Sequence, residues 1–159
     1  MRDFQRSRLY KAEWAVRFDH RALGSLEECQ AYVDEMRTDK SLTEFRHLPK
    51  IKVVPGRGAA KANFHLFEGA TMELPRWARN EFTILHELAH FATPPNSADH
   101  GPVFAWLELQ AIQRKFGKSN ADELRGWYSY YKVKVGKTNS ARKQRAPKHW
   151  TPPGQSGTV

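Results

Sequence analysis

Cysteine is almost absent from this sequence, whose 159 residues include only one, Cys29. A single cysteine excludes an internal disulfide framework and a thiolate-based zinc knuckle, so any metal would have to be held by histidines and carboxylates. It also favours a reducing, cytoplasmic location. No apolar run approaches the roughly 18 residues of a membrane-spanning helix, and no apolar segment follows the charged N-terminus. We therefore expect neither a membrane span nor a secretory signal.

Acidic residues are also missing from Leu124 to the C-terminus, where eight of the 26 basic residues lie. The whole chain carries a net charge of +9, but residues 1–123 carry only +1 because 18 basic residues nearly balance 17 acidic ones. From Gly136 on, the sequence is rich in Pro, Gly, Ser, Lys and Arg and poor in apolar residues. We therefore expect a folded domain over residues 1–135 and a disordered basic tail over residues 136–159. Such a tail could contact the phosphates of a nucleic acid or be a solvated extension.

The hydrophobic pattern predicts an α+β fold. We expect helices over residues 3–17, from Ser25 to about Arg37, from Arg76 or Ala78 to Ala92, from Pro102 to about Phe116, and from about Ser119 past Tyr131, with a further helical turn over residues 41–47. Short alternating or β-branched runs over residues 51–54, 63–67 and 70–74 predict strands. Together they predict a small antiparallel sheet of about three strands packed on helices.

The segment His86-Glu87-Leu88-Ala89-His90 is the part of the sequence that indicates chemistry. Residues four apart lie on one face of a helix, so both imidazoles can reach the same ion. Glu87 lies about 100° further round the helix, close enough to contact a water at that ion. Zinc suits two imidazoles because it accepts nitrogen ligands and keeps a position open for water in catalytic sites. The segment therefore predicts two zinc ligands and a general base for hydrolysis.

The rest of this helix supports that interpretation. Its polar residues occupy a single arc of about 100°, and the remaining positions are apolar. Such a pattern is typical of a buried helix that directs its polar groups into a cleft. The alternative is a pair of histidines that form hydrogen bonds within the core or lie on a solvated stripe.

Zinc needs a third protein ligand, and His100 is the leading candidate. It follows His90 by ten residues, after the turn predicted at Pro94-Pro95. Asp99 and Glu108 are the carboxylate alternatives. Glu108 could instead hold an imidazole ligand in one tautomer. The alternative for His100 is an exposed loop histidine.

These motifs resemble a known family. His86-Glu87-x-x-His90 followed by His100-Gly101-Pro102-x-Phe104 resembles the SprT-like branch of the zincin metallopeptidases. The opening Arg2-Asp3-x-Gln5-Arg6-x-x-x-Tyr10-x-Ala12-Glu13, together with the segment 85–90, is similar to a family of small actinobacterial and actinophage metallohydrolases. The similarity spans most of residues 1–130. The opening pattern by itself indicates no particular chemistry.

The resemblance implies a minimal zincin-like domain, in which a small twisted sheet packs on an active-site helix and a ligand-bearing helix. It implies His86, His90 and His100 as ligands of Zn²⁺ and Glu87 as general base. Zincins bind an extended peptide along an edge strand, and residues 70–74 are the candidate because they lead into the active-site helix, although an ordinary core strand is the alternative. Candidates for the donor to the oxyanion are Tyr128, Tyr130 and Tyr131, which could equally be packing residues.

Two functions follow as hypotheses. The first is a zinc-dependent hydrolase, most simply a metallopeptidase acting on a peptide or protein. The second is a nucleic-acid-binding protein in which zinc is structural or vestigial. The two can be combined, because SprT-like proteases act on proteins attached to DNA.

Overall fold

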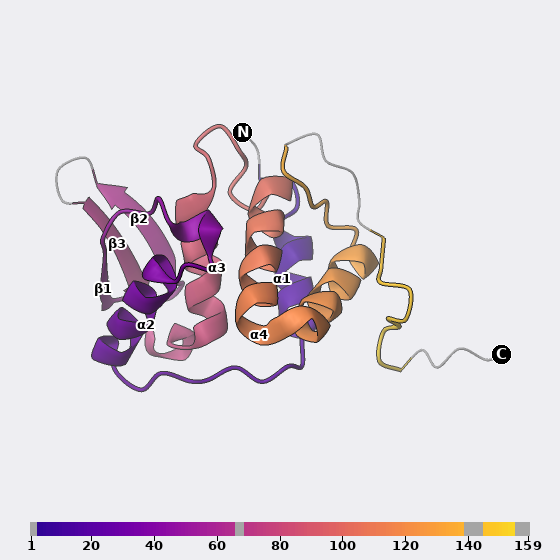
Figure 1. The fold of residues 1–159 in the computed structure, drawn as a ribbon, viewed down its shortest axis with the longest axis horizontal. Coiled ribbons are helices and arrows are strands. Elements are labelled where there is room, and N and C mark those ends of the chain that lie inside the picture. Colours follow the sequence, from indigo (N-terminus) through magenta and orange to yellow (C-terminus); the bar gives the residue numbers. More distant parts are fainter. Residues whose placement is uncertain (1–2, 66–68, 139–144, 155–159) are drawn as a thin grey trace. The chain divides into compact units, whose positions relative to one another are not determined.

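The computed structural model describes residues 3–65, 69–138 and 145–154. These residues form an α+β fold with four α-helices and one three-stranded sheet, which confirms the predicted fold class (Figure 1). The chain divides into two compact units. The first consists of residues 1–18 and 95–159, and the second of residues 19–94. In the described residues, no helix combines the length and the apolar character needed to cross a membrane.

In the unit of residues 19–94, the helix α2 (Leu26–Thr38) begins as its sequence predicts. The Ser25 hydroxyl accepts a hydrogen bond from the backbone N–H of Glu28, and the Glu28 carboxylate accepts one from the backbone N–H of Ser25. This reciprocal pair satisfies two of the N–H groups that a helix start leaves open. A 3₁₀ turn (Thr43–Phe45) follows where a short helical turn is expected.

The sheet contains β1 (Ile51–Pro55), β2 (Lys61–His65) and β3 (Gly69–Leu74) in the order β1-β3-β2. β2 and β3 are antiparallel, but β1 and β3 are parallel, so the prediction of an antiparallel sheet is wrong for one of the two pairs. The alternation of a strand predicts which faces are buried and does not predict its partner. The central place belongs to β3, which buries Ala70, Met72 and Leu74 on one face.

This order also corrects the prediction that residues 70–74 form the edge strand. β3 is hydrogen-bonded on both sides, so it has no free edge for a peptide. At the β1 edge, the side-chain amide of Gln30 donates to the carbonyl of Ile51 (2.9 Å) and accepts from the N–H of Val53 (2.8 Å). One carbonyl and one N–H of β1 are thus already bonded to Gln30 of α2. The edge strand that remains for an added strand is β2.

The helix α3 (Glu81–Ala92) begins later than the predicted Arg76 or Ala78. Residues 76–78 form a separate 3₁₀ turn, and Asn80 is the N-cap, with its side-chain oxygen accepting from the N–H of Thr83 (2.8 Å). Asparagine is among the preferred N-cap residues because it satisfies an open N–H group without adopting helical dihedral angles. The end of the helix at Ala92 agrees with the prediction.

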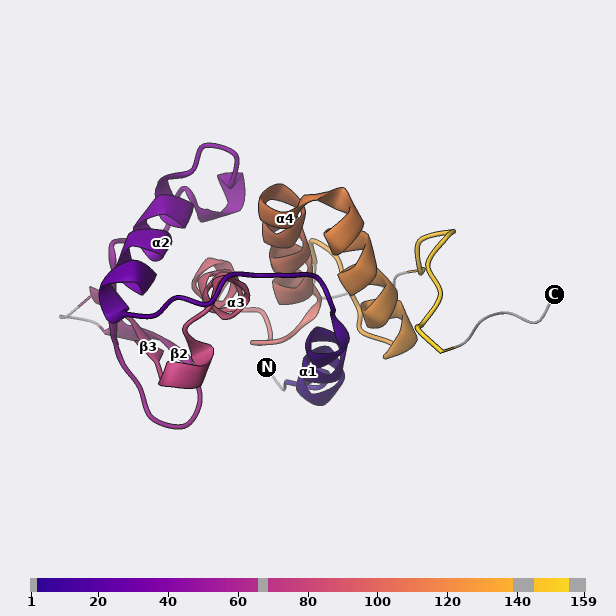
Figure 2. The same cartoon turned by 90° about the horizontal axis from the view of Figure 1, so that it is seen from below.

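In the other unit, α1 (Arg6–Ala15) packs against α4 (Pro102–Tyr130). α4 bends sharply, as Figures 1 and 2 show. The bend coincides with Gly117, whose φ of 85° and ψ of 167° are not helical, so the two predicted helices on either side of this residue are confirmed. This region of φ and ψ is essentially restricted to glycine.

The predicted basic tail includes residues 139–144 and 155–159, which lie outside the described residues. Within the described part, Trp150 packs edge-to-face on Trp127 of α4, with 5.2 Å between ring centroids. Gly126 makes room for this contact, since a Cβ atom there would lie 2.0 Å from the Trp150 ring. Trp150, in the predicted tail, therefore packs on α4.

Candidate metal centre

Most residues of the helix α3 are buried, and its polar residues are buried with its apolar ones. Its buried residues are Phe82, Ile84, Leu85, His86, Glu87, Leu88, Ala89 and Phe91. His86 and Glu87 are each 5% exposed, and His90 is partly buried. Burying an imidazole and a carboxylate is costly unless they are hydrogen-bonded, charged against a partner or bound to a metal. The burial therefore favours a specific role for these residues over a solvated stripe.

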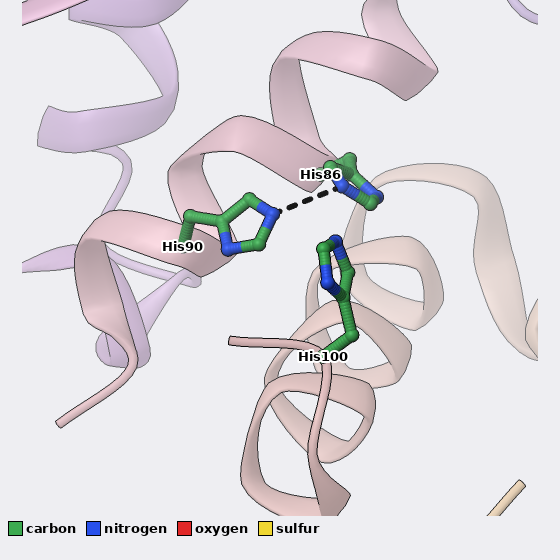
Figure 3. Close-up of side chains that lie close together, drawn as sticks. All are labelled: His86, His90 and His100. Atoms are coloured by element: carbon green, nitrogen blue, oxygen red, sulfur yellow. Dashed lines mark hydrogen bonds between the residues drawn. The ribbon is translucent and has the colours of Figure 1, made fainter. Parts of the chain in front are cut away.

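The two imidazoles of α3 face each other through their Nε2 atoms, which lie 3.2 Å apart (Figure 3). Their ring centroids are 4.9 Å apart, and the ring planes are inclined at 73°. With Zn–N bonds of about 2.0–2.1 Å, a tetrahedral zinc ion holds two of its nitrogen ligands about 3.3 Å apart. In this structure the contact is a hydrogen bond between the two rings, and its length is also the separation that a single ion requires. This fit depends on α3 alone.

Glu87 follows His86 directly, so its side chain leaves α3 about 100° round from that imidazole. It is therefore beside the ligand face and not on it. A carboxylate in this place can accept a proton from a molecule held at the ion without being a ligand itself.

The open edge of the sheet lies next to the same helix, because β2 packs against α3. Phe64 of β2 meets Phe91 of α3 edge-to-face, with 4.9 Å between ring centroids, although Phe64 remains 64% exposed. An exposed aromatic side chain on an edge strand is suited to contact an extended chain that adds to that edge.

His100 belongs to the other unit, two residues before α4, and it is buried there. Its Nδ1 lies 2.7 Å from a carboxylate oxygen of Asp3, and its Nε2 lies 3.1 Å from the hydroxyl of Tyr10. Phe104, one turn into α4, packs edge-to-face on the imidazole. His100 is therefore no exposed loop histidine, and its orientation is defined by several contacts.

Two predicted alternatives to His100 have different surroundings in this unit. Asp99 is exposed. Glu108 is fully buried, and its carboxylate accepts a hydrogen bond from the hydroxyl of Tyr128. Burial raises the pKa of Tyr128 well above its ordinary value, and the negative charges of Glu108 and Glu13 raise it further. Tyr128 therefore stays protonated and serves as a donor to Glu108.

Asp3 and Tyr10 were not singled out as site residues from the sequence, although both belong to the opening motif. Their contacts with His100 span 97 and 90 residues of sequence, respectively. The only sequence signal for these two residues is that both belong to the opening motif. The spacing of that motif matches no known pattern of metal ligands, so it does not reveal their role.

No family model matches the chain, and no curated protein or solved structure matches it either.

Proposed function

We propose that this protein is a zinc-dependent hydrolase, most simply a metallopeptidase of the SprT-like zincin type. The observation that carries the proposal is the 3.2 Å separation of the Nε2 atoms of His86 and His90 on one buried helix. Glu87 stands beside them as the general base. These three residues come from one helical turn, so the arrangement needs only that α3 forms.

His100 is the proposed third ligand. Supporting this role are its burial and the contacts that orient both of its ring nitrogens. Asp99 and Glu108 remain the alternatives. Asp99 is exposed and Glu108 already accepts the Tyr128 hydrogen bond, so both are weaker candidates than His100.

Zinc bound by these histidines would polarise a substrate carbonyl and bring the pKa of a water close to neutrality. Glu87 then takes the proton of the attacking water and delivers it to the leaving amine. The buried setting of Glu87 keeps bulk water from competing for that proton.

The substrate proposed is a peptide or an unfolded segment of a protein. One side of β2 is hydrogen-bonded to β3, and its other side is the edge of the sheet. An extended chain can add to this edge through main-chain hydrogen bonds. Phe64 would contact one of its side chains. Hydrolysis of a peptide bond is proposed for this reason, and not because zinc requires it.

The first test is the variant Glu87→Gln, assayed on an unstructured protein such as casein. We expect zinc to be retained and the hydrolysis rate to fall about 10²- to 10⁴-fold, because only the proton acceptor is lost. The matched control is Glu27→Gln on the exposed side of α2, which should leave the rate unchanged. Full activity of Glu87→Gln would contradict the mechanism.

We also propose that the basic C-terminal region contacts nucleic acid. Its support is the charge distribution, because eight basic residues and no acidic one lie from Leu124 onward. Deletion of residues 136–159 should weaken binding to DNA and reduce its dependence on salt. An unchanged affinity and salt dependence would remove this partner from the proposal. A cytoplasmic location is proposed as well, since the single cysteine, Cys29, is a buried free thiol.

A further inference from the structure

The opening segment of the chain is organised around His100. Asp3 contacts one ring nitrogen of His100 and Tyr10 contacts the other. Gln5 anchors the segment between them, because its side-chain amide both donates to the carbonyl of Lys134 (3.0 Å) and accepts from its N–H (2.9 Å). Two residues after Lys134, the backbone N–H of Gly136 donates to the carbonyl of Pro102 at the start of α4 (3.1 Å).

The remaining residues of the opening motif support this arrangement. The guanidinium of Arg6 lies 5.6 Å from the centre of the Tyr10 ring, on the same helix. Ala12 is fully buried, and Glu13 is close enough to Tyr128 to affect its pKa. Of these side chains, Arg6 contacts the Tyr10 ring. Two residues of the motif, Asp3 and Tyr10, thus contact His100 directly, and Arg2 lies outside the described residues.

The contact with Asp3 determines which nitrogen of His100 can bind a metal. An ionised carboxylate accepts hydrogen bonds and cannot donate them, so Nδ1 must carry the proton in the neutral ring. The lone pair is then on Nε2, which is where the Tyr10 hydroxyl donates its hydrogen. Histidine ligands of metals are commonly held in one tautomer by such a carboxylate.

We propose that Asp3 is a positioning residue that presents Nε2 of His100 to the metal, and that the Tyr10 hydroxyl occupies Nε2 until the metal displaces it. The inference rests on the proposed function, because it takes His100 to be a ligand. It adds two residues from the start of the chain to the surroundings of His100. Asp3 raises the metal affinity of His100, whereas Tyr10 lowers it.

The first experiment uses the metal-free protein with isotope-labelled histidine, so it does not depend on zinc or on activity. Ring-nitrogen NMR spectra in alkaline buffer, where imidazoles are neutral, report which nitrogen is protonated. We expect the Nδ1–H tautomer for His100, and a shift toward Nε2–H in Asp3→Ala. The control Asp19→Ala removes an exposed carboxylate and should change nothing. The same tautomer in Asp3→Ala and in the unaltered protein would overturn the role of Asp3.

The second experiment measures Zn²⁺ affinity by competition with a chelator. Asp3→Ala should lower the affinity about 10- to 100-fold, as the loss of an outer partner of a metal ligand does. Asp3→Asn keeps the size and one acceptor oxygen, so it should give a smaller loss and guards against a folding defect. Tyr10→Phe should raise the affinity roughly 2- to 10-fold, because the metal no longer has to displace a hydrogen bond.

The control for Tyr10→Phe is Tyr32→Phe, which removes a buried hydroxyl in the unit of residues 19–94 and should leave zinc affinity unchanged. Equal affinities of the unaltered protein, Asp3→Ala and Tyr10→Phe would overturn the inference while leaving the α3 site intact. Failure of the proposed function has a different signature. In that case His90→Ala would bind zinc as well as the unaltered protein does, and the tautomer result would still stand.

Discussion

The two units of the molecule position their polar side chains in different ways. In residues 19–94, the candidate ligands His86 and His90 and the candidate base Glu87 come from one turn of α3. In the other unit, His100 is oriented by Asp3 and Tyr10, which are 97 and 90 residues away in sequence. The first arrangement depends on helix geometry, and the second depends on how distant segments pack. The comparison explains why the sequence identifies His86, Glu87 and His90 by their spacing but does not identify the partners of His100.

The largest expected effect concerns zinc affinity, and it tests whether both arrangements serve one ion. His90→Ala and His100→Ala should each reduce the affinity more than the roughly 10- to 100-fold expected for an outer partner, because each removes a proposed direct ligand. A chelator competition assay measures this, with the exposed His47→Ala as control. If only His90→Ala loses affinity, the third ligand is not His100, and Glu108→Gln becomes the next variant.

The next effect compares a buried tyrosine in each unit. Burial raises the pKa of both Tyr32 and Tyr128 above the ordinary value of 10.0, and neighbouring carboxylates raise them further. Above about pH 10 each tyrosine ionises in the unfolded chain and stays protonated in the folded one. Below this pH the two tyrosines should not affect the pH dependence of the free energy of unfolding. Above it, the free energy of unfolding should fall by about 1.4 kcal/mol per pH unit for each tyrosine.

Denaturant unfolding between neutral and alkaline pH measures this slope. Tyr32→Phe and Tyr128→Phe should each make it less steep, and Tyr130→Phe, which alters a half-exposed ring, should have little effect. A slope that is the same in all variants would contradict the burial argument. Tyr128→Phe carries an additional cost of about 1–3 kcal/mol at neutral pH, because Glu108 loses a buried donor.

The smallest effects concern the N-cap of α3 and the bend in α4. Gly117→Ala should destabilise the protein by about 1–3 kcal/mol, since the backbone there is in a region essentially restricted to glycine. Asn80→Ala removes the N-cap of α3 and should cost about 0.5–2 kcal/mol. Urea unfolding measures both, with the exposed Gln113→Ala of α4 as control. Equal stability of Gly117→Ala and the control would show that the bend in α4 tolerates a side chain.

Much of the secondary structure could be predicted because it is governed by short-range rules. The capping box at Ser25 and Glu28, the end of α3 at Ala92 and the break at Gly117 all follow from a few neighbouring residues. The start of α3 was placed too early, because residues 76–78 form a 3₁₀ turn whose pattern resembles a helix. Boundaries of this kind depend on one side chain, here Asn80.

Strand pairing was the part of the fold that could not be predicted. The sequence pattern predicts the three strands, although residues 66–67 of the second lie outside the described residues. It wrongly predicts β3 at an edge, although β3 is central, and β1 as antiparallel, although β1 is parallel to β3. The side-chain amide of Gln30, on α2, forms hydrogen bonds with the backbone at the β1 edge. The residue pattern of a strand cannot predict such a contact with a helix. The edge strand proposed for a peptide is therefore β2, and not β3 as the sequence pattern predicts.

The sequence by itself determined that His86 and His90 share one face of α3, because the helical repeat of about 3.6 residues brings residues four apart onto one face. The spacing of two histidines and a glutamate is sufficient for that, and the Nε2 separation of 3.2 Å agrees with it. Only the tertiary structure decided the surroundings of His100. Its hydrogen bonds to Asp3 and Tyr10 exist because packing closes loops of about ninety residues, and no local pattern specifies which distant residues will meet.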